Sequence, residues 1–359
     1  MKVGIVGLPN AGKSTLFNAL TAGGAETGAY PFTTIDPNVA IVEVPDDRLE
    51  RLADVVGSSK LVPATIEFHD IAGLVAGASR GEGLGNRFLA AIRETDAICH
   101  VVRAHGSEDV THPEGRVDPL ADVELIETEL MAADLDQAER RLQRVSKEAK
   151  SGDEEAIAER DWLERVVGGL QSGKPVREFP APEAAPGAAR RLSALTDKPV
   201  LYVANVAEDE DEVPAELVAH AEQVDAAAVA ISARVESELR ELDPEEAAEM
   251  RSGLGISRSA LDQLIRSAFD LLDLIVFFTA GADSEAVART LPRGGTAWDA
   301  AGRVHTDIQE GFVRADVISF DDLVAAGGYA AARDRGSLRT EGRDYAICDG
   351  DVITVHHRG

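Results

Sequence analysis

The spacing of apolar residues changes along the chain and divides it into stretches of different structure. Over residues 1–120 and 196–273, short apolar runs such as Val3–Val6 and Val200–Ala204 alternate with helical patterns. Runs of this kind are typical of buried strands that are connected by helices. The two stretches therefore predict one α/β domain with a mostly parallel sheet and flanking helices.

Between residues 121 and 195 the pattern changes to that of two long helices. One set of apolar residues recurs at spacings of three and four, and a second set follows the turn at Ser151-Gly152-Asp153. The sets are Leu135, Ala138, Leu142, Val145 and Ala149, then Ala156, Leu163, Val166 and Leu170. This periodicity predicts an antiparallel helical hairpin inserted into the α/β domain.

The last part of the chain, residues 274–359, has the pattern of a small β-sheet module. Short alternating runs are separated by turn signals at Asp283, Gly294-Gly295 and Asp349-Gly350-Asp351. Short strands punctuated by turns of this kind predict a β-grasp module.

Composition indicates a globular protein with an unusual charge. The chain has 44% hydrophobic residues, 28% charged residues and a formal net charge of −28. So acidic a surface repels a nucleic-acid backbone, and contact with RNA would need a local basic patch. The chain begins with a strand and has no apolar run long enough to span a membrane. We therefore expect a cytoplasmic protein without membrane contact.

Residues 7–14, Gly-Leu-Pro-Asn-Ala-Gly-Lys-Ser, form a complete G-x-x-x-x-G-K-S phosphate loop. An apolar run precedes the loop and a helical pattern follows it, which is the order that a nucleoside triphosphate site requires. Backbone N–H groups and the helix N-terminus favour phosphate here. Lys13 supplies positive charge, and the Ser14 hydroxyl can bind Mg²⁺. A nucleoside triphosphate is therefore the predicted ligand.

Two later motifs indicate a nucleotide-sensing switch. A threonine in the loop before Val39–Val42 can complete the Mg²⁺ shell, and we select Thr34, with Thr33 as the alternative. Asp70 ends a later strand, where it can hold Mg²⁺ through water, and Gly73 can bring its N–H to the γ-phosphate. This order of motifs defines the GTPase class of phosphate-loop proteins and is absent from nucleotide kinases.

Leu74 occupies the position where Ras-type enzymes have a glutamine that orients the attacking water. Leucine can neither donate nor accept a hydrogen bond, so we expect slow hydrolysis. The water would then be positioned by His112, by Arg80 or Glu82, or by a monovalent cation such as K⁺ bound to Asn10. The alternatives are that His112 is a solvated loop residue and that Asn10 braces the phosphate loop.

The base-recognition element follows Val200–Ala204 and reads Asn205-Val206-Ala207-Glu208. Guanine-specific proteins carry Asn-Lys-x-Asp, whose aspartate accepts two hydrogen bonds from guanine. Val206 replaces the lysine, and the longer Glu208 displaces the carboxylate by about 1.5 Å from that geometry. Guanine loses its selective contacts, so ATP becomes as good a candidate as GTP. Ser232, one strand later, is expected in the loop that closes over the base.

Together these motifs resemble one family, the Obg-like ATPases or YchF family of the translation-factor GTPases. The matching strings lie at residues 7–15, 31–38, 70–75, 77–86 and 205–208, with further matches at 278–281 and 305–307. The resemblance spans essentially the whole chain. It implies that the β-grasp module is a TGS domain.

The resemblance also implies an activity and its residues. ATP would be bound in preference to GTP and hydrolysed slowly with Mg²⁺, as a conformational switch that associates with ribosomes (50S or 70S). By position, Ser14 and Thr34 would hold the Mg²⁺, and Asn205 with the Val206 backbone would hold the adenine. The residues implied to hold the phosphates are Asn10, Ala11, Gly12, Lys13, Ser14 and Thr15.

The helical insertion carries the densest basic stripe of this acidic chain. Arg140, Arg144 and Lys147 lie at i, i+4 and i+7 of its first helix, with Arg141 and Lys150 nearby. This spacing places the first three on one helix face. We regard the stripe as a candidate contact for RNA or a ribosomal protein. The alternative is a solvated face with intrahelical ion pairs.

Two other functions remain open from the sequence. One is a GTP-specific switch GTPase of the same architecture. The other is a nucleotide-stabilised, ribosome-binding scaffold whose hydrolysis is incidental. Relative affinities for ATP and GTP distinguish the GTP-specific GTPase from the ATPase. A phosphate-loop variant that cannot hydrolyse nucleotide but still binds the partner would indicate the scaffold.

Overall fold

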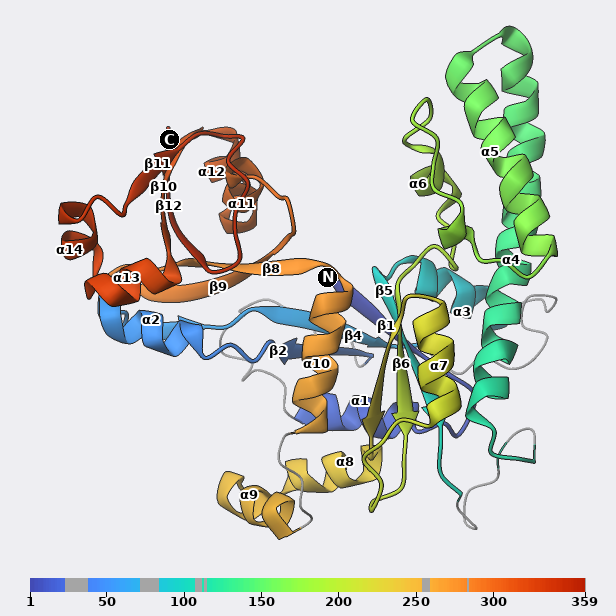
Figure 1. The fold of residues 1–359 in the computed structure, drawn as a ribbon, viewed down its shortest axis with the longest axis horizontal. Coiled ribbons are helices and arrows are strands. Elements are labelled where there is room, and N and C mark those ends of the chain that lie inside the picture. The colour runs from blue at the N-terminus through green and yellow to red at the C-terminus, as the bar shows by residue number, and fades with distance from the viewer. Residues whose placement is uncertain are drawn as a thin grey trace. The chain divides into compact units, whose positions relative to one another are not determined.

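The computed structural model describes residues 1–22, 38–71, 84–106, 112, 115–253, 259–282 and 284–358 (Figure 1). The chain divides into two compact units. The first comprises residues 1–23, 35–40 and 67–271, and the second residues 24–34, 41–66 and 272–359. Residues 41–66, which the sequence pattern places in the α/β domain, thus group with the C-terminal part of the chain.

A six-stranded sheet forms the core of the first unit, with the strand order β2-β4-β1-β5-β6-β7. Neighbouring strands from β4 to β7 run parallel, as the apolar runs predict. The strands are β1 (Lys2–Val6), β2 (Val39–Glu43), β4 (Thr65–Asp70), β5 (Ala97–Arg103), β6 (Val200–Asn205) and β7 (Ala227–Ile231).

Helices bury the sheet of the first unit. Apolar residues of β5 and β6 pack with Val123 of α4 (Pro119–Glu148) and Leu217 of α7, and α10 packs against β6 and β7. Helix α8 packs against α1, which follows the phosphate loop directly. The helices are α1 (Lys13–Ala22), α3 (Leu84–Arg93), α7 (Ala215–Gln223), α8 (Ala233–Glu241), α9 (Pro244–Gly253) and α10 (Ala260–Leu271).

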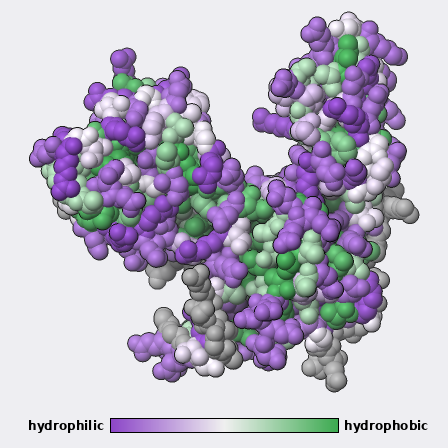
Figure 2. All heavy atoms as spheres, viewed as in Figure 1, coloured by the Kyte–Doolittle hydropathy of each residue, from purple (hydrophilic) through white to green (hydrophobic). Residues whose placement is uncertain are grey.

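The helical hairpin expected between β5 and β6 is present in the first unit. It consists of α4 (Pro119–Glu148) and α5 (Glu154–Gln171), and the chain returns to the sheet through η3 (Val176–Glu178) and α6 (Ala188–Leu192). Asp118 caps α4 through the Ala121 N–H, and Asp153 caps α5 through the Glu155 and Ala156 N–H groups, which satisfies helix-end donors. Hydrophilic side chains cover most of the hairpin surface seen in Figure 2.

The second unit contains a mixed sheet with the strand order β11-β10-β12-β8-β9-β3. Its strands are β8 (Leu274–Thr279), β9 (Glu285–Pro292), β10 (Phe312–Ser319), β11 (Arg339–Glu341), β12 (Asp351–His357) and β3 (Lys60–Val62). Strand β12 pairs parallel with β8, and β8 pairs antiparallel with β9, which gives the β-grasp core. Helix α11 (Ala297–Val304) buries Ala297 and Ala300 against this sheet. Three shorter helices complete the module: α12 (Thr306–Glu310), α13 (Phe320–Ala326) and α14 (Tyr329–Asp334).

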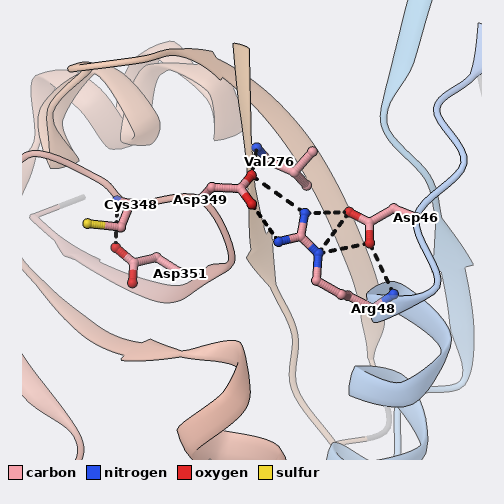
Figure 3. Close-up of polar contacts among 6 residues, drawn as sticks. All are labelled: Asp46, Arg48, Val276, Cys348, Asp349 and Asp351. Atoms are coloured by element: carbon pink, nitrogen blue, oxygen red, sulfur yellow. Dashed lines mark hydrogen bonds and ion pairs between the residues drawn. The ribbon is translucent and has the colours of Figure 1, made fainter. Parts of the chain in front are cut away.

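Residues from early in the chain extend this module. Strand β3 pairs parallel with β9, and α2 (Arg48–Val56) packs against α13. Arg48 also forms ion pairs with Asp46 and Asp349 (Figure 3). The second unit therefore combines residues from early in the chain with residues 272–359, which follow more than two hundred residues later. Across the described ranges, no helix has the length and apolarity that a bilayer span requires.

Candidate functional site

The phosphate loop joins β1 to α1 and has a backbone that requires glycine at two points. Gly12 has a φ of +99°, and a Cβ at this position would lie 2.2 Å from Nδ2 of Asn205. A Cβ at Gly7 would lie 2.3 Å from the Val101 carbonyl oxygen. Asn10 also lies in the left-handed region, with a φ of +64°. The motif glycines thus allow the loop to pass close to β5 and β6.

Two opposite charges lie at the phosphate end of the site. Lys13 is only 7% exposed, and its Nζ donates a hydrogen bond of 2.8 Å to the Leu8 carbonyl oxygen. Burial lowers the pKa of Lys13, and the charge of Asp70 opposes this shift. Burial raises the pKa of Asp70, at the end of β4, and the charge of Lys13 opposes that shift. Each group therefore stabilises the ionised form of the other.

A pocket of about 930 Å³ extends from the phosphate loop to the loops that follow β6 and β7. It lies at the carboxyl ends of the parallel strands, where α/β sheets bind their ligands. The predicted residues that line it are Asn10, Gly12, Lys13, Ser14, Thr15, Asn205, Val206, Glu208 and Ser232. Ala11 is buried, and its carbonyl oxygen accepts a hydrogen bond from Asn205.

Asn205 joins the two loops at the base end of the pocket. Its Nδ2 donates to the Ala11 carbonyl oxygen, and its Oδ1 accepts from the Ala233 N–H, both at 3.1 Å. The Val206 N–H donates to the Ile231 carbonyl oxygen at 3.0 Å. Two backbone donors at this end, on Val206 and Ala233, are therefore already bonded to the protein.

Glu208 does not stand alone at the rim of the pocket. Its carboxylate pairs with Arg234 at 3.0 Å, and Arg234 also pairs with Glu238 one helical turn later. All three side chains are largely exposed, so the pairs contribute little to stability. They do hold the Glu208 carboxylate beside a cation of α8.

Arg103 at the end of β5, with His105 and Gly106 after it, lines the pocket although no sequence motif marks these residues. Arg103 is 2% exposed, and its Nε donates to the carbonyl oxygen of His105 at 3.0 Å. Arg103 is also the register partner of Asn205 in β6. In the sequence, only the position of Arg103 directly after the apolar run of β5 could have indicated that it lines the pocket.

His112 lies apart from the residues that line this pocket. It is buried, and its Nε2 lies 2.8 Å from Oδ2 of Asp122 in α4. Burial raises the pKa of Asp122, whereas the hydrogen bond from His112 lowers it. His112 is thus not a solvated loop residue, and its Nε2 is engaged by Asp122.

Oxygen donors suited to a divalent metal lie near the phosphate loop. Ser14 is exposed in the pocket, and the half-buried Asp70 lies close enough to Lys13 for each charge to affect the other. Hydroxyl and carboxylate oxygens are ligands that Mg²⁺ prefers. Thr34, Gly73 and Leu74 lie outside the described residues.

Comparison with known proteins gives a consistent picture. Residues 2–134 match a family model described as "50S ribosome-binding GTPase", and residues 274–358 match the YchF GTPase C-terminal model, described as "Protein of unknown function (DUF933)". The chain is 48% identical over 359 residues to the "Ribosome-binding ATPase YchF" of Bacillus subtilis (strain 168), with 98% of both chains covered. The protein of that name from Escherichia coli O157:H7 is 47% identical over 355 residues, with the same coverage.

A solved structure is similar over the whole chain. The structure of the Schizosaccharomyces pombe YchF GTPase aligns with a TM-score of 0.87 and 33% sequence identity. The alignment covers 99% of this chain and 97% of that one. The similarity therefore includes the hairpin and the C-terminal module as well as the nucleotide-binding sheet.

Proposed function

Because the chain belongs to the YchF family, we propose that it is a Mg²⁺-dependent ATPase that binds and slowly hydrolyses ATP and associates with ribosomes as a conformational switch. The names of its bacterial relatives support both the ATPase activity and the ribosome association. The pocket at the phosphate loop is the site of this activity.

The hydrogen bonding at the base end carries the choice of ATP over GTP. Guanine presents a carbonyl oxygen where adenine presents an amino group, so guanine needs a donor from the protein. The Val206 and Ala233 N–H groups already donate to Ile231 and Asn205. With these two backbone donors already bonded, the base end favours the base that brings its own donor, because an unpaired polar atom is costly.

The phosphate end binds and neutralises the triphosphate. Lys13 and the backbone N–H groups from Asn10 to Thr15 would hold the phosphate oxygens. Ser14 would hold Mg²⁺ directly, and Asp70 would hold it through water, with Thr34 completing the shell. The bound ion supplies charge neutralisation for phosphoryl transfer. Asn10 would hold K⁺ if a monovalent cation takes part in hydrolysis.

The chain itself links both switch loops to the second unit. Residues 41–66, which connect the loop of Thr34 to the strand of Asp70, belong to that unit. Strand β3 fixes them to β9, and Arg48 fixes them to Asp349. Any change in the two loops on hydrolysis therefore acts on a segment that is anchored in the β-grasp module.

The exposed basic residues of α4 are the proposed contact for RNA or a ribosomal protein. Arg140, Arg144 and Lys147 are exposed, although Arg140 pairs with Asp136. Arg141 belongs to a different set, since it turns inward to Glu159. The exposed basic residues that remain are Arg140, Arg144, Lys147 and Lys150. Charge reversal of Arg144 and Lys147 should weaken ribosome binding. Arg141 is left unchanged, because reversing its charge would break the inward ion pair with Glu159 and disturb the fold.

The proposal is tested by nucleotide affinity and by ribosome pelleting. Calorimetry should give tighter binding of Mg·ATP than of Mg·GTP, and a preference for GTP of more than about tenfold, or 1.4 kcal/mol, would overturn the ATP assignment. Lys13→Ala should abolish hydrolysis and also the effect of a non-hydrolysable ATP analogue on pelleting. If this variant still pellets with ribosomes to the full extent of the unaltered protein, whether or not nucleotide is present, the scaffold function is favoured instead.

A further inference from the structure

A second cavity lies within the first unit, on the sheet face that carries α4 and α7. It has a volume of about 190 Å³ and shares no lining residue with the nucleotide pocket. Its walls come from β5, β6, α4 and α7, and from the segment that leads from the hairpin back to the sheet. We call it the root cavity, because it lies where the hairpin joins the sheet.

His100 of β5 supplies an unusual polar group to the root cavity. Its side chain is 2% exposed, and among the described residues its Nε2 has no hydrogen-bond partner. Burial, together with the charges of Lys13 and His220, lowers the pKa of His100 to about 3. The imidazole is therefore neutral at physiological pH and has one donor and one acceptor nitrogen. A buried imidazole nitrogen without a partner is costly, unless something in the cavity binds it.

A carboxylate of helix α4 also lines the cavity. Glu127 of α4 accepts a hydrogen bond from the Tyr202 hydroxyl, and its Oε1 lies 3.3 Å from Nε2 of His220. Burial and the negative charge of Glu127 raise the pKa of Tyr202, so the phenol stays protonated and continues to donate. The rings of His100 and Tyr202 are in contact, with centroids 5.8 Å apart. Tyr202 thus contacts the His100 ring and holds the Glu127 carboxylate, and both His100 and Glu127 line the cavity.

The remaining walls are mainly aliphatic, with two carboxylates, Glu127 and Glu178, and two basic side chains, Arg177 and His220. His220 lies against Glu127, and the Arg177 guanidinium donates to the Thr196 carbonyl oxygen. The aliphatic lining comes from Ile98, Ile126, Leu130, Leu195, Val200 and Val224. The floor is buried, whereas Gly173 and Glu178 are exposed at the mouth. A ligand can therefore enter from solvent.

We propose that the root cavity binds a short aliphatic primary ammonium ion. Its N–H groups would donate to Nε2 of His100 and to the carboxylate of Glu127, and its alkyl chain would lie on the aliphatic walls. Such a ligand gives the imidazole its missing partner and adds a charge-assisted hydrogen bond. A carboxylic acid of the same size would meet Glu127 with like charge, and an alcohol would lack the charge. The site is independent of the proposed ATPase activity.

The probe for this site is n-butylammonium chloride, titrated into the full-length protein by calorimetry and compared with n-butanol and sodium butyrate. We expect saturable binding of butylammonium, with both isosteres weaker by about tenfold or more. Glu127→Gln and His100→Leu should each abolish that preference. The matched control is Glu124→Gln, which changes an exposed carboxylate of the same helix outside the cavity. Unchanged Mg·ATP affinity checks that each variant is folded.

A nuclear magnetic resonance measurement on the unaltered protein tests the proposal without any variant that could misfold. Butylammonium should shift the ¹⁵N resonance of Nε2 in His100, whereas equal concentrations of NaCl should not. The proposal is overturned if the three isosteres bind equally, if Glu127→Gln keeps the preference, or if none binds and the nitrogen resonance does not move. The last outcome would mean that the cavity holds water only.

Discussion

Arg48 and Asp349 lie 301 positions apart in the chain, yet the Nη1 of one is 2.6 Å from the Oδ2 of the other. Arg48 also binds Asp46, and its guanidinium lies over the ring of Phe278, 5.4 Å from the centroid. Asp349 in turn accepts the N–H of Val276 in β8 (Figure 3). One arginine thus attaches the segment between the switch loops to the core of the β-grasp module.

Arg48→Met should lower the free energy of unfolding of the second unit by about 1–2 kcal/mol, because it leaves Asp46 and Asp349 without their shared cation. The matched control is Lys60→Met, which removes the Lys60–Glu285 pair of the same unit. That pair is about half exposed on both sides, so its loss should cost under about 0.5 kcal/mol. Chemical denaturation measures both. Equal costs would show that the Arg48 network is no more than a surface ion pair.

Gly12→Ala should reduce Mg·ATP affinity by more than about tenfold, because the new Cβ would displace Asn205 and strain the left-handed backbone. Gly57→Ala is the control. Gly57 is also left-handed, with a φ of +74°, but its added Cβ would meet nothing within 4 Å. It should cost about 1 kcal/mol of stability and leave ATP affinity unchanged. A matching loss of affinity in both variants would mean that backbone strain alone, and not the contact with Asn205, controls the site.

Val206→Lys combined with Glu208→Asp should move the ratio of GTP to ATP affinity toward GTP by about tenfold or more. The double variant restores both guanine-reading side chains, and it also separates the carboxylate from Arg234. Glu208→Gln keeps the length of the side chain but removes the charge, so it should not favour GTP. Calorimetric titration with each nucleotide measures the ratios. An unchanged ratio in the double variant would place base selection elsewhere.

The hairpin should lose stability as the pH falls through the acidic range. Burial raises the pKa of Glu159, but hydrogen bonds from Arg141 and Arg191 outweigh burial and leave the pKa below its ordinary value of 4.5. A carboxyl group whose pKa is lowered on folding stabilises the protein above its unfolded pKa, and this stabilisation disappears as pH falls through the folded pKa. Thermal unfolding between neutral pH and pH of about 3 should show the loss.

Glu159→Gln should remove this part of the pH dependence and cost about 3 kcal/mol at neutral pH, because two arginines lose a buried partner. Glu155→Gln is the matched control, since Glu155 pairs with the same Arg191 but is 53% exposed. Its cost should stay under about 0.5 kcal/mol, and the acid transition should remain. If the Glu159→Gln protein loses stability over the same acidic pH range as the unaltered protein, the transition belongs to other carboxylates.

His112→Ala should lower the free energy of unfolding by about 1–3 kcal/mol, because the buried Asp122 loses its hydrogen bond. If His112 also positions water, kcat should fall by about a hundredfold or more while ATP affinity is unchanged. Asp122→Asn tests the partner: it keeps the shape of the pair and should lower stability, with a smaller change in kcat. Single-turnover hydrolysis and denaturation separate the two roles. An unaltered kcat in both variants makes the pair purely structural.

The sequence alone determined the features that depend on neighbouring residues. The phosphate loop, the altered base motif and the two long helices follow from short-range spacing, and the family and fold class predicted from them are confirmed. Turn chemistry, helix periodicity and apolar strand runs are local properties, so they can be read without knowing which surfaces meet.

Only the tertiary structure decided the relationships between distant residues. The three-residue strand β3 is too short to carry a pattern, and its pairing with β9 depends on a surface that forms elsewhere. Arg103 reaches the nucleotide pocket because β5 lies beside β6, and His112 is buried because α4 brings Asp122 to it. Such contacts depend on burial and on the partner that each charged group meets, and neither is a property of nearby sequence.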